Sequence, residues 1–136
     1  MTATVTPFLM FNPVDGQAQA DRALALYASA FPDVEVLEMT RYDAEGPGAA
    51  GSVQKARFRI GAQEVLCIDS PITHAFTFTP SASLFVEFTD TAALDHAYAT
   101  LAEGGGVLMP LDAYPFSPRY AWLADRFGVS WQLGLA

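Results

Sequence analysis

The most informative stretch of this chain is WLADRFGVSWQ, residues 122–132, close to its C-terminus. Asp125 and Gly128 give its centre the composition of a tight turn, because aspartate can bond nearby backbone N–H groups and glycine can adopt positive φ. After the turn, large apolar side chains alternate strictly with small or polar ones. The apolar set is Val129, Trp131, Leu133 and Leu135, and the other set is Ser130, Gln132 and Gly134. This alternation predicts a closing strand that packs on helices with one face and opens to a cavity with the other.

The two halves of the chain show the same predicted order of secondary-structure elements. Periodicity predicts a strand, a helix and three further strands in each half, because apolar residues recur at helical spacing and then alternate. The predicted helices cover residues 17–30 and 92–103, the second capped by Asp90 or Thr91 and ended by Gly104-Gly105-Gly106. The predicted strands cover residues 5–11, 34–42, 52–60, 64–69, 84–88, 107–110, 119–125 and 130–135. The sequence therefore predicts an α+β fold made of two βαβββ units.

Length and composition predict one globular domain. The chain has 136 residues, of which 51% are hydrophobic and 16% are charged, and this composition suits a packed core rather than a disordered chain. We expect a single domain over residues 1–136, with units of approximately 1–70 and 82–136 and a connection over 70–81. The connection is rich in aromatic residues and threonine, so it packs either over the mouth of a cavity or along a sheet edge.

Charge and cysteine content exclude several classes of partner. The net charge of -8 argues against binding to nucleic acid or anionic membranes, because both require a basic surface. No basic N-terminal segment precedes an apolar one, and no apolar run approaches the roughly 20 residues of a membrane span. The single cysteine, Cys67, cannot form an internal disulfide, which favours a reducing compartment. We therefore expect a cytoplasmic protein that binds neither nucleic acid nor membrane.

Four more stretches, together with residues 122–132, carry a family resemblance. They are TPFLMF (6–11), ALALYASAFPD (23–33), FTFTPSASLFV (76–86) and LAEGG (101–105). In this order they resemble the vicinal-oxygen-chelate (glyoxalase/bleomycin-resistance/dioxygenase) superfamily, in particular its PhnB-like branch, the 3-demethylubiquinone-9 3-methyltransferase-like domain. The resemblance spans nearly the whole chain and implies curved mixed sheets with the helices outside. It implies no single activity, because the superfamily includes dioxygenases, isomerases, lyases, thiol transferases and non-catalytic drug binders.

The resemblance also implies where a metal would be held. Catalytic relatives use histidine and glutamate side chains from the first, fourth, fifth and last strands, and their last strand carries Asp-x-x-Gly-x-x-x-Glu. This chain keeps that spacing from Asp125, but Gln132 stands in place of the glutamate. The fifth-strand position falls on Ser83 and the first-strand position falls near Pro7 or Phe8. An amide, a hydroxyl and a hydrocarbon suit a divalent cation poorly, so we expect no metal and no cofactor.

A cup that binds a small-molecule ligand is the main functional prediction. The face of strand 84–88 that points away from the helix would share this cup with the polar face of strand 130–135. The predicted lining residues are Met10, Ser83, Phe85, Glu87, Ser130 and Gln132. Small residues at Ser130 and Gly134 leave room that a pure core would fill. Glu87 is the candidate catalytic base or cation ligand if the cup desolvates it; otherwise it is a solvated residue at the exposed end of its strand.

Basic residues concentrate on one predicted strand. Lys55, Arg57 and Arg59 alternate with apolar neighbours, so they share one face. They either hold an anionic group inside the cup, or pair with acids on an outer strand or protect a sheet edge, and we favour the second reading. Arg41 and Tyr42, at the end of the preceding strand, could join either arrangement.

The remaining reactive side chains give little evidence of a site. His96 is expected on a helix surface, and His74 is expected in a loop unless it overhangs the cavity. Cys67 lies among apolar strand residues, which predicts a buried and inert thiol. Tyr120 and Trp122 are consistent with either the core or the ligand site.

Three functions are consistent with the sequence. The first is a metal-independent protein that binds a small molecule in an apolar and aromatic cup. The second is an enzyme acting on a small oxo or aromatic substrate, with Glu87 as base and Gln132 and Ser83 as hydrogen-bond donors to an oxyanion. The third is a structural dimer with a vestigial cup. We expect a homodimer, because relatives cover open strand edges with a second copy, and the units could pair within or between chains.

Overall fold

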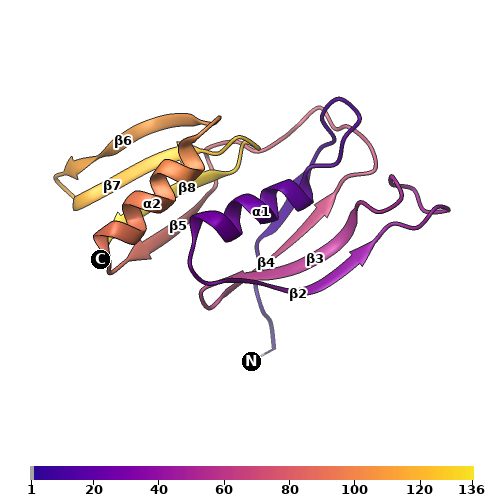
Figure 1. Ribbon diagram of the computed structural model, residues 1–136, viewed down its shortest axis with the longest axis horizontal. Coiled ribbons are helices and arrows are strands. Elements are labelled where there is room, and N and C mark those ends of the chain that lie inside the picture. Colours follow the sequence, from indigo (N-terminus) through magenta and orange to yellow (C-terminus); the bar gives the residue numbers. More distant parts are fainter. Residues whose placement is uncertain (1) are drawn as a thin grey trace. The chain divides into compact units, whose positions relative to one another are not determined.

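The structure, a computed structural model, describes residues 2–136 and contains two four-stranded sheets (Figure 1). The first sheet has the strand order β1-β4-β3-β2 and the second has the order β5-β8-β7-β6. The pairs β1–β4 and β5–β8 are parallel, and all other pairs are antiparallel. The elements are β1 (Phe8–Phe11), α1 (Ala20–Ala30), β2 (Val34–Arg41), β3 (Val53–Ile60), β4 (Gln63–Asp69), β5 (Ser83–Phe88), α2 (Thr91–Ala102), β6 (Gly106–Tyr114), β7 (Ser117–Ala124) and β8 (Ser130–Leu135). This order confirms the predicted α+β fold of two βαβββ units.

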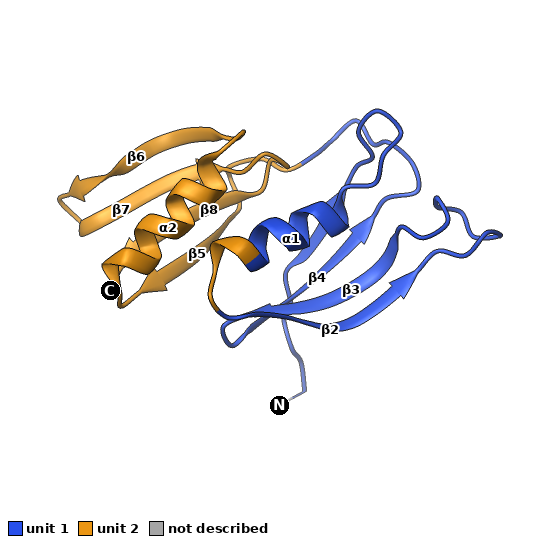
Figure 2. Ribbon diagram, in the orientation of Figure 1, with its two compact units in different colours: residues 1–28, 33–77 blue, residues 29–32, 78–136 orange. Residues whose placement is uncertain are grey.

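The chain divides into two compact units (Figure 2). The first unit comprises the described residues up to Ala28 together with Asp33–Thr77, and the second comprises Ser29–Pro32 and Phe78–Ala136. The boundary between the units therefore falls inside the connection predicted at 70–81, most of which groups with the first unit. The single domain over the whole chain stays a prediction. Neither helix in the described part of the chain has the length and hydropathy of a membrane span.

The core of the first unit lies between α1 and one face of its sheet. Ala23 and Tyr27 of α1 are buried, and the Tyr27 ring stacks on Phe58 of β3 with 6.3 Å between ring centroids. Ala56 is buried on the same face of β3, whereas Arg57, between the two, points to the opposite face. The alternation of β3 thus separates the core of this unit from its open face.

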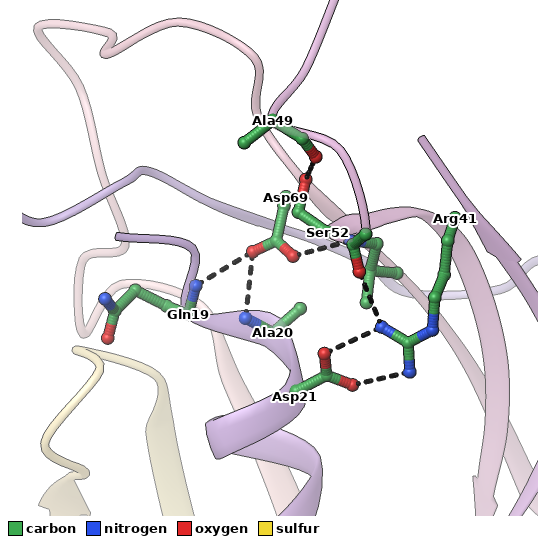
Figure 3. Close-up of polar contacts among 9 residues, drawn as sticks. Gln19, Ala20, Asp21, Arg41, Ala49, Ser52 and Asp69 are labelled. Carbon is green, nitrogen blue, oxygen red and sulfur yellow. Dashed lines mark hydrogen bonds and ion pairs between the residues drawn. The ribbon is translucent and has the colours of Figure 1, made fainter. Parts of the chain in front are cut away.

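The first helix begins at Ala20 rather than at Gln17, which corrects the predicted start. Gln17 instead pairs with Val14 in an isolated bridge. The carboxylate of Asp69, at the end of β4, caps the helix: its Oδ1 accepts hydrogen bonds from the backbone N–H groups of Gln19 and Ala20, both at 2.9 Å (Figure 3). The first N–H groups of any helix lack partners within the helix. Here a residue distant in sequence supplies the missing acceptor.

Asp69 also fixes β3. Its second oxygen, Oδ2, accepts a hydrogen bond from the Val53 N–H group at 2.9 Å, and its backbone carbonyl accepts one from the Tyr42 hydroxyl at 3.1 Å. Asp69 is only 3% exposed, so its charge is stabilised by these donors rather than by water. One buried carboxylate therefore joins the start of α1 to the ends of two strands.

In the second unit, α2 packs on the apolar face of β7 and β8. Asp90 caps the helix, because its side chain accepts a hydrogen bond from the Ala93 N–H group at 3.2 Å, and this confirms one of the two predicted caps. The buried residues of this core include Leu94, Ala97 and Leu101 of α2 and Val129, Trp131 and Leu133 in and beside β8. The Trp131 ring lies 5.2 Å from the Phe31 ring. The predicted facing of the last strand is thus confirmed, although Leu135 is only partly buried.

The turn before β8 has the predicted geometry. Asp125 Oδ1 accepts hydrogen bonds from the backbone N–H groups of Phe127 at 2.8 Å and Val129 at 3.1 Å. Its Oδ2 accepts a third from the Trp131 indole N–H at 2.9 Å. Gly128 has φ of 93°, a conformation that costs glycine little. The buried aspartate therefore holds both the turn and the largest side chain of the core.

Some predicted strand boundaries were wrong. The first strand begins at Phe8 and not at residue 5, because pairing with β4 begins at Leu66. The strand predicted at 107–110 extends over Gly106–Tyr114 as β6. Pro110 does not end it, because β6 is an edge strand whose pairing with β7 is already irregular there, and such positions tolerate a missing N–H group.

Candidate ligand-binding face

The candidate site is built on the face of the second sheet that points away from α2, which we call the open face. Trp131 and Leu133 point toward the core, so Ser130, Gln132 and Gly134 point to the open face. Register then places partners beside them. The pairs are Ser83 with Ser130, Phe85 with Gln132 and Glu87 with Gly134 on β5 and β8, and Trp122 with Gln132 and Tyr120 with Gly134 on β7 and β8. Five of the six predicted cup residues therefore share one face of one sheet.

Hydrogen bonds between side chains link neighbouring strands of the open face near Ser130, where β8 begins. The hydroxyl groups of Ser83 and Ser130 share a hydrogen bond of 2.7 Å. The Trp122 indole N–H donates to the Ser130 hydroxyl at 2.9 Å. Ser130 is buried, and the Trp122 ring is half-buried. The polar group of Trp122 is therefore satisfied within the sheet, which leaves its ring as an apolar surface.

Tyr120 and Gln132 form a second polar pair on the open face. The Tyr120 hydroxyl donates to the Gln132 side-chain oxygen Oε1 at 2.5 Å. Tyr120 is 5% exposed. Burial, with a smaller contribution from Tyr114, raises the pKa of the Tyr120 phenol, so it remains a protonated donor at neutral pH. The amide of Gln132 is thus held by a buried phenol.

Aromatic rings gather around Tyr120. Its ring centroid lies 4.9 Å from that of Phe116, 5.7 Å from that of Tyr114 and 6.4 Å from that of Phe85. Phe116 stands in the tight turn between β6 and β7, where its ring stacks on Tyr114 at 5.6 Å. Phe85 is 56% exposed and Phe116 is 65% exposed. We call Phe85, Tyr114, Phe116 and Tyr120 the aromatic cluster, which offers apolar surface to solvent beside the Gln132 amide.

Two expectations about this face can be compared with the structure. The room beside Gly134 is limited, because a Cβ atom there would already be in van der Waals contact, 3.5 Å from Cζ of Phe85 and 4.0 Å from Cδ2 of Tyr120. The Phe85 ring thus covers the glycine. Glu87 is exposed, and no ion pair or hydrogen bond of its carboxylate occurs among residues 2–136. Its position matches a solvated residue rather than a desolvated base.

Met10, the sixth predicted cup residue, belongs to the first sheet. It pairs with Ile68 of β4 and is half-buried. Its convergence with the other five residues in one cup stays a prediction. The sequence reasoning missed Tyr114 and Phe116 and left Tyr120 and Trp122 undecided. The signal for the last two was available: they alternate with the buried Ala121 and Leu123 along β7.

Two of the three basic residues of β3, Arg57 and Arg59, pair with acids, as favoured, and no ion pair of Lys55 occurs within residues 2–136. Arg57 contacts Glu64 at 2.9 Å and Glu38 at 3.9 Å. Arg59 contacts Asp33 at 2.9 Å and Glu35 at 3.0 Å, and these acids raise its pKa. The expectation of an outer or edge strand was wrong, since β3 lies between β4 and β2. The two guanidinium groups are thus already neutralised by carboxylates.

Arg41 pairs with an acid, as in the favoured reading, whereas Tyr42 joins neither arrangement. Arg41 forms an ion pair with Asp21 of α1 at 2.8 Å and donates to the Gly51 carbonyl at 2.9 Å (Figure 3). Hydrogen bonding to Asp21 is the main reason that the pKa of Arg41 is raised. Tyr42 is buried with its hydroxyl on Asp69. Both side chains therefore stabilise the first unit.

The histidines and the cysteine occupy structural positions. His74 lies in a loop, where its ring stacks on Phe76 at 4.8 Å. His96 is exposed on α2, with Nε2 at 2.8 Å from the Ser29 carbonyl. Cys67 is fully buried, and burial raises the pKa of its thiol to about 12. The predicted burial is confirmed, and the raised pKa disfavours a nucleophilic thiolate, which needs a lowered pKa.

The donor set at the family's metal positions does not fit a divalent cation. The Ser83 hydroxyl is bonded to Ser130, and the Gln132 oxygen accepts the Tyr120 proton. Phe8, near the first-strand position, offers a hydrocarbon. Within residues 2–136, no group of three or more His, Cys, Asp or Glu side chains could hold a metal ion. Divalent metals prefer imidazole and carboxylate ligands, and neither occurs at these positions.

The chain matches one family model and is similar to several solved structures. The model of the family described as 3-demethylubiquinone-9 3-methyltransferase matches residues 3–134. A PhnB protein from Bacillus cereus shares 44% identity over 98% of this chain and 100% of its own, with a TM-score of 0.90. PA1353 from Pseudomonas aeruginosa shares 22% identity over 98% of both chains, with a TM-score of 0.78. The fosfomycin resistance protein FosX from Listeria monocytogenes shares 10% identity over 98% of this chain and 93% of its own, with a TM-score of 0.67. The last two share the fold alone, and no curated protein matches.

Proposed function

We propose that this chain is a metal-independent protein that binds a small molecule. The premise is its family: it belongs to the 3-demethylubiquinone-9 3-methyltransferase family, in the PhnB-like branch of the vicinal-oxygen-chelate superfamily. The observation that carries the proposal is the aromatic cluster on the open face of the second sheet. The proposed ligand is a flat, largely apolar molecule.

The aromatic cluster supports this ligand class because its outer rings are exposed and because a buried neighbour holds them in place. Phe85 and Phe116 present more than half of their surface to solvent, while both rings contact the buried Tyr120. Exposed aromatic surface that is held in place by buried neighbours suits a flat partner, because little side-chain freedom is lost on binding. Ligand sites typically combine such apolar walls with a few polar groups, a role that we assign to Gln132 and Ser83.

Metal independence is supported by the chemistry of the donor atoms. Gln132 and Ser83 make hydrogen bonds to neighbouring side chains with the oxygen atoms that a metal would need. Binding a cation there would break two hydrogen bonds and gain two neutral ligands. We therefore propose that ligand binding uses stacking and hydrogen bonding alone.

Equilibrium dialysis against fluorene, a flat tricyclic hydrocarbon, tests the proposal. We expect saturable binding that is unchanged by prior treatment with EDTA. Phe85→Ala should weaken binding roughly three- to tenfold, since a ring contact contributes on the order of 0.5–1.5 kcal/mol. Val14→Ala is the matched control, because Val14 is also 56% exposed but lies outside the open face. Equal effects of the two substitutions, or binding that requires an added divalent cation, would contradict the proposal.

We further propose that the protein is a homodimer. Exposed apolar residues on the strands β2 and β6 support the dimer, because edge strands with such residues tend to be covered. They are Val36, Leu37, Val107 and Leu108. Sedimentation at micromolar concentration tests the assembly, and a monomer as the sole species would count against it.

A further inference from the structure

The Gln132 amide has a fixed orientation on the open face. A tyrosine hydroxyl can either donate to an amide oxygen or accept from an amide nitrogen. The Tyr120–Gln132 distance of 2.5 Å decides between them, because O–H···O bonds are shorter than N–H···O bonds. The oxygen of Gln132 is therefore turned toward Tyr120 and accepts its proton, and the amide nitrogen is the end that we expect to meet a ligand.

The amide nitrogen has no hydrogen-bond acceptor among the described residues. Register places Gln132 between Phe85 on β5 and Trp122 on β7. Phe85 has no polar side-chain atom, and the indole N–H of Trp122 already donates to Ser130. No hydrogen bond from Gln132 Nε2 occurs within residues 2–136, and the side chain is half-buried. The two N–H groups of this amide are thus left without a protein acceptor in the described part of the chain.

The charges beside the amide disfavour an anion. The neighbouring row of the sheet runs from Glu87 through Gly134 and Tyr120 to Asp112. Arg119, next to Tyr120 on β7, is paired with Asp95 of α2 on the other face of the sheet. A carboxylate or phosphate would therefore approach two acids with no basic side chain in the same row, whereas a neutral acceptor would meet little repulsion.

We propose that Gln132, oriented by Tyr120, selects flat aromatic ligands that carry a neutral carbonyl-type hydrogen-bond acceptor. This inference rests on the proposed function, since it specifies the ligand class of the same site. Tyr120 acts as a positioning residue, and Gln132 makes the contact. A site built to donate hydrogen bonds discriminates against a ligand that cannot accept them, because its own donors then lose water without a partner.

Three tricyclic probes of nearly the same shape test the inference by equilibrium dialysis. Fluorenone carries a carbonyl acceptor, fluorene carries neither donor nor acceptor, and carbazole carries an N–H donor. Wild-type protein should bind fluorenone roughly three- to tenfold more tightly than fluorene, as expected for one neutral hydrogen bond. Carbazole should bind no better than fluorene.

Gln132→Glu reverses the polarity of the contact without changing its shape. A carboxylate still accepts the Tyr120 proton but has no N–H group to donate. Fluorenone should lose its advantage and carbazole should gain one. Gln54→Glu makes the same chemical change at an exposed position of β3 and should leave all three affinities unchanged. Tyr120→Phe, which frees the amide to rotate, should narrow the difference between fluorenone and carbazole.

The outcomes separate this inference from the proposed function. If none of the three probes binds, the proposed function fails and the inference fails with it. If fluorene and fluorenone bind equally well to the wild type, binding stands and the inference is overturned. Retention of the fluorenone preference in Gln132→Glu would also overturn it.

Discussion

The two sheets share one strand order but present open faces of opposite chemistry. On the first sheet, Arg57 and Arg59 are each held between carboxylates. On the second sheet, the corresponding inner strand β7 carries Tyr120 and Trp122, whose polar atoms bond to neutral side chains. The βαβββ frame therefore determines which residues share a face, while the residues alone determine what that face can bind.

The contrast extends to how each unit satisfies the start of its helix. Asp90 caps α2 from the adjacent residue, as local sequence predicts. Asp69 caps α1 from the far end of β4 and also bonds β3. The first unit therefore depends on a long-range polar contact, and the second depends on a local cap and a large aromatic core. Three substitutions test this comparison.

Trp131→Ala should have the largest effect. The side chain is fully buried and its indole N–H bonds Asp125, so its removal should cost about 3–5 kcal/mol of unfolding free energy. Denaturant unfolding measures the loss. Trp122→Ala, on the opposite face of the same sheet, should cost clearly less because that ring is only half-buried. A loss under about 1 kcal/mol for Trp131→Ala would contradict the assignment of the faces.

Asp69→Asn should have an intermediate effect. The carboxylate accepts three backbone N–H groups, and an asparagine would turn an NH₂ group toward at least one of them. Leaving buried donors unsatisfied should cost about 1–3 kcal/mol in the same measurement. Asp90→Asn is the matched control, since asparagine caps an exposed helix start as well as aspartate does. Equal losses of unfolding free energy from the two substitutions would mean that the two units depend equally on the aspartates that cap their helices.

Arg57→Gln should have the smallest effect. Its carboxylate partners are well exposed, with side-chain exposures of 47% for Glu64 and 62% for Glu38, and such pairs contribute about 0–1 kcal/mol. The difference from the wild type should shrink further at high salt, because exposed charges are screened. A loss above about 2 kcal/mol would show that the charged face of the first sheet is as important to stability as a core contact.

Local patterns predicted the fold where the determining contacts are local. The strand Ser130–Leu135, the turn at Asp125 and the Asp90 cap all follow from neighbours in sequence. The start of α1 could not be predicted, because its cap is Asp69 on a distant strand. The strand β6 was predicted too short for the same reason, because its length is set by pairing with β7 and not by Pro110.

The candidate site was predictable only in part for a related reason. Alternation and spacing predicted that Ser83, Phe85, Ser130 and Gln132 face the same cup, but only the pairing of β5 with β8 shows which of them are neighbours. The aromatic cluster arises from pairing between β7 and β8 and from the turn that carries Phe116. Spacing along one strand contains no information about such cross-strand neighbours, so Gly134 was expected to leave room that Phe85 in fact covers.

The Asp69 cap has a consequence for the order of events during folding. The acceptor for the first N–H groups of α1 lies 49 residues further along the chain than Ala20, so β4 must dock before the helix start is satisfied. Closing a loop of that length is slow compared with forming a helical turn. On a ribosome, α1 would emerge long before its cap is synthesised, whereas α2 would carry its own. We therefore expect the second unit to nucleate without help from distant strands, and the start of α1 to become protected from hydrogen exchange only when β3 and β4 are in place.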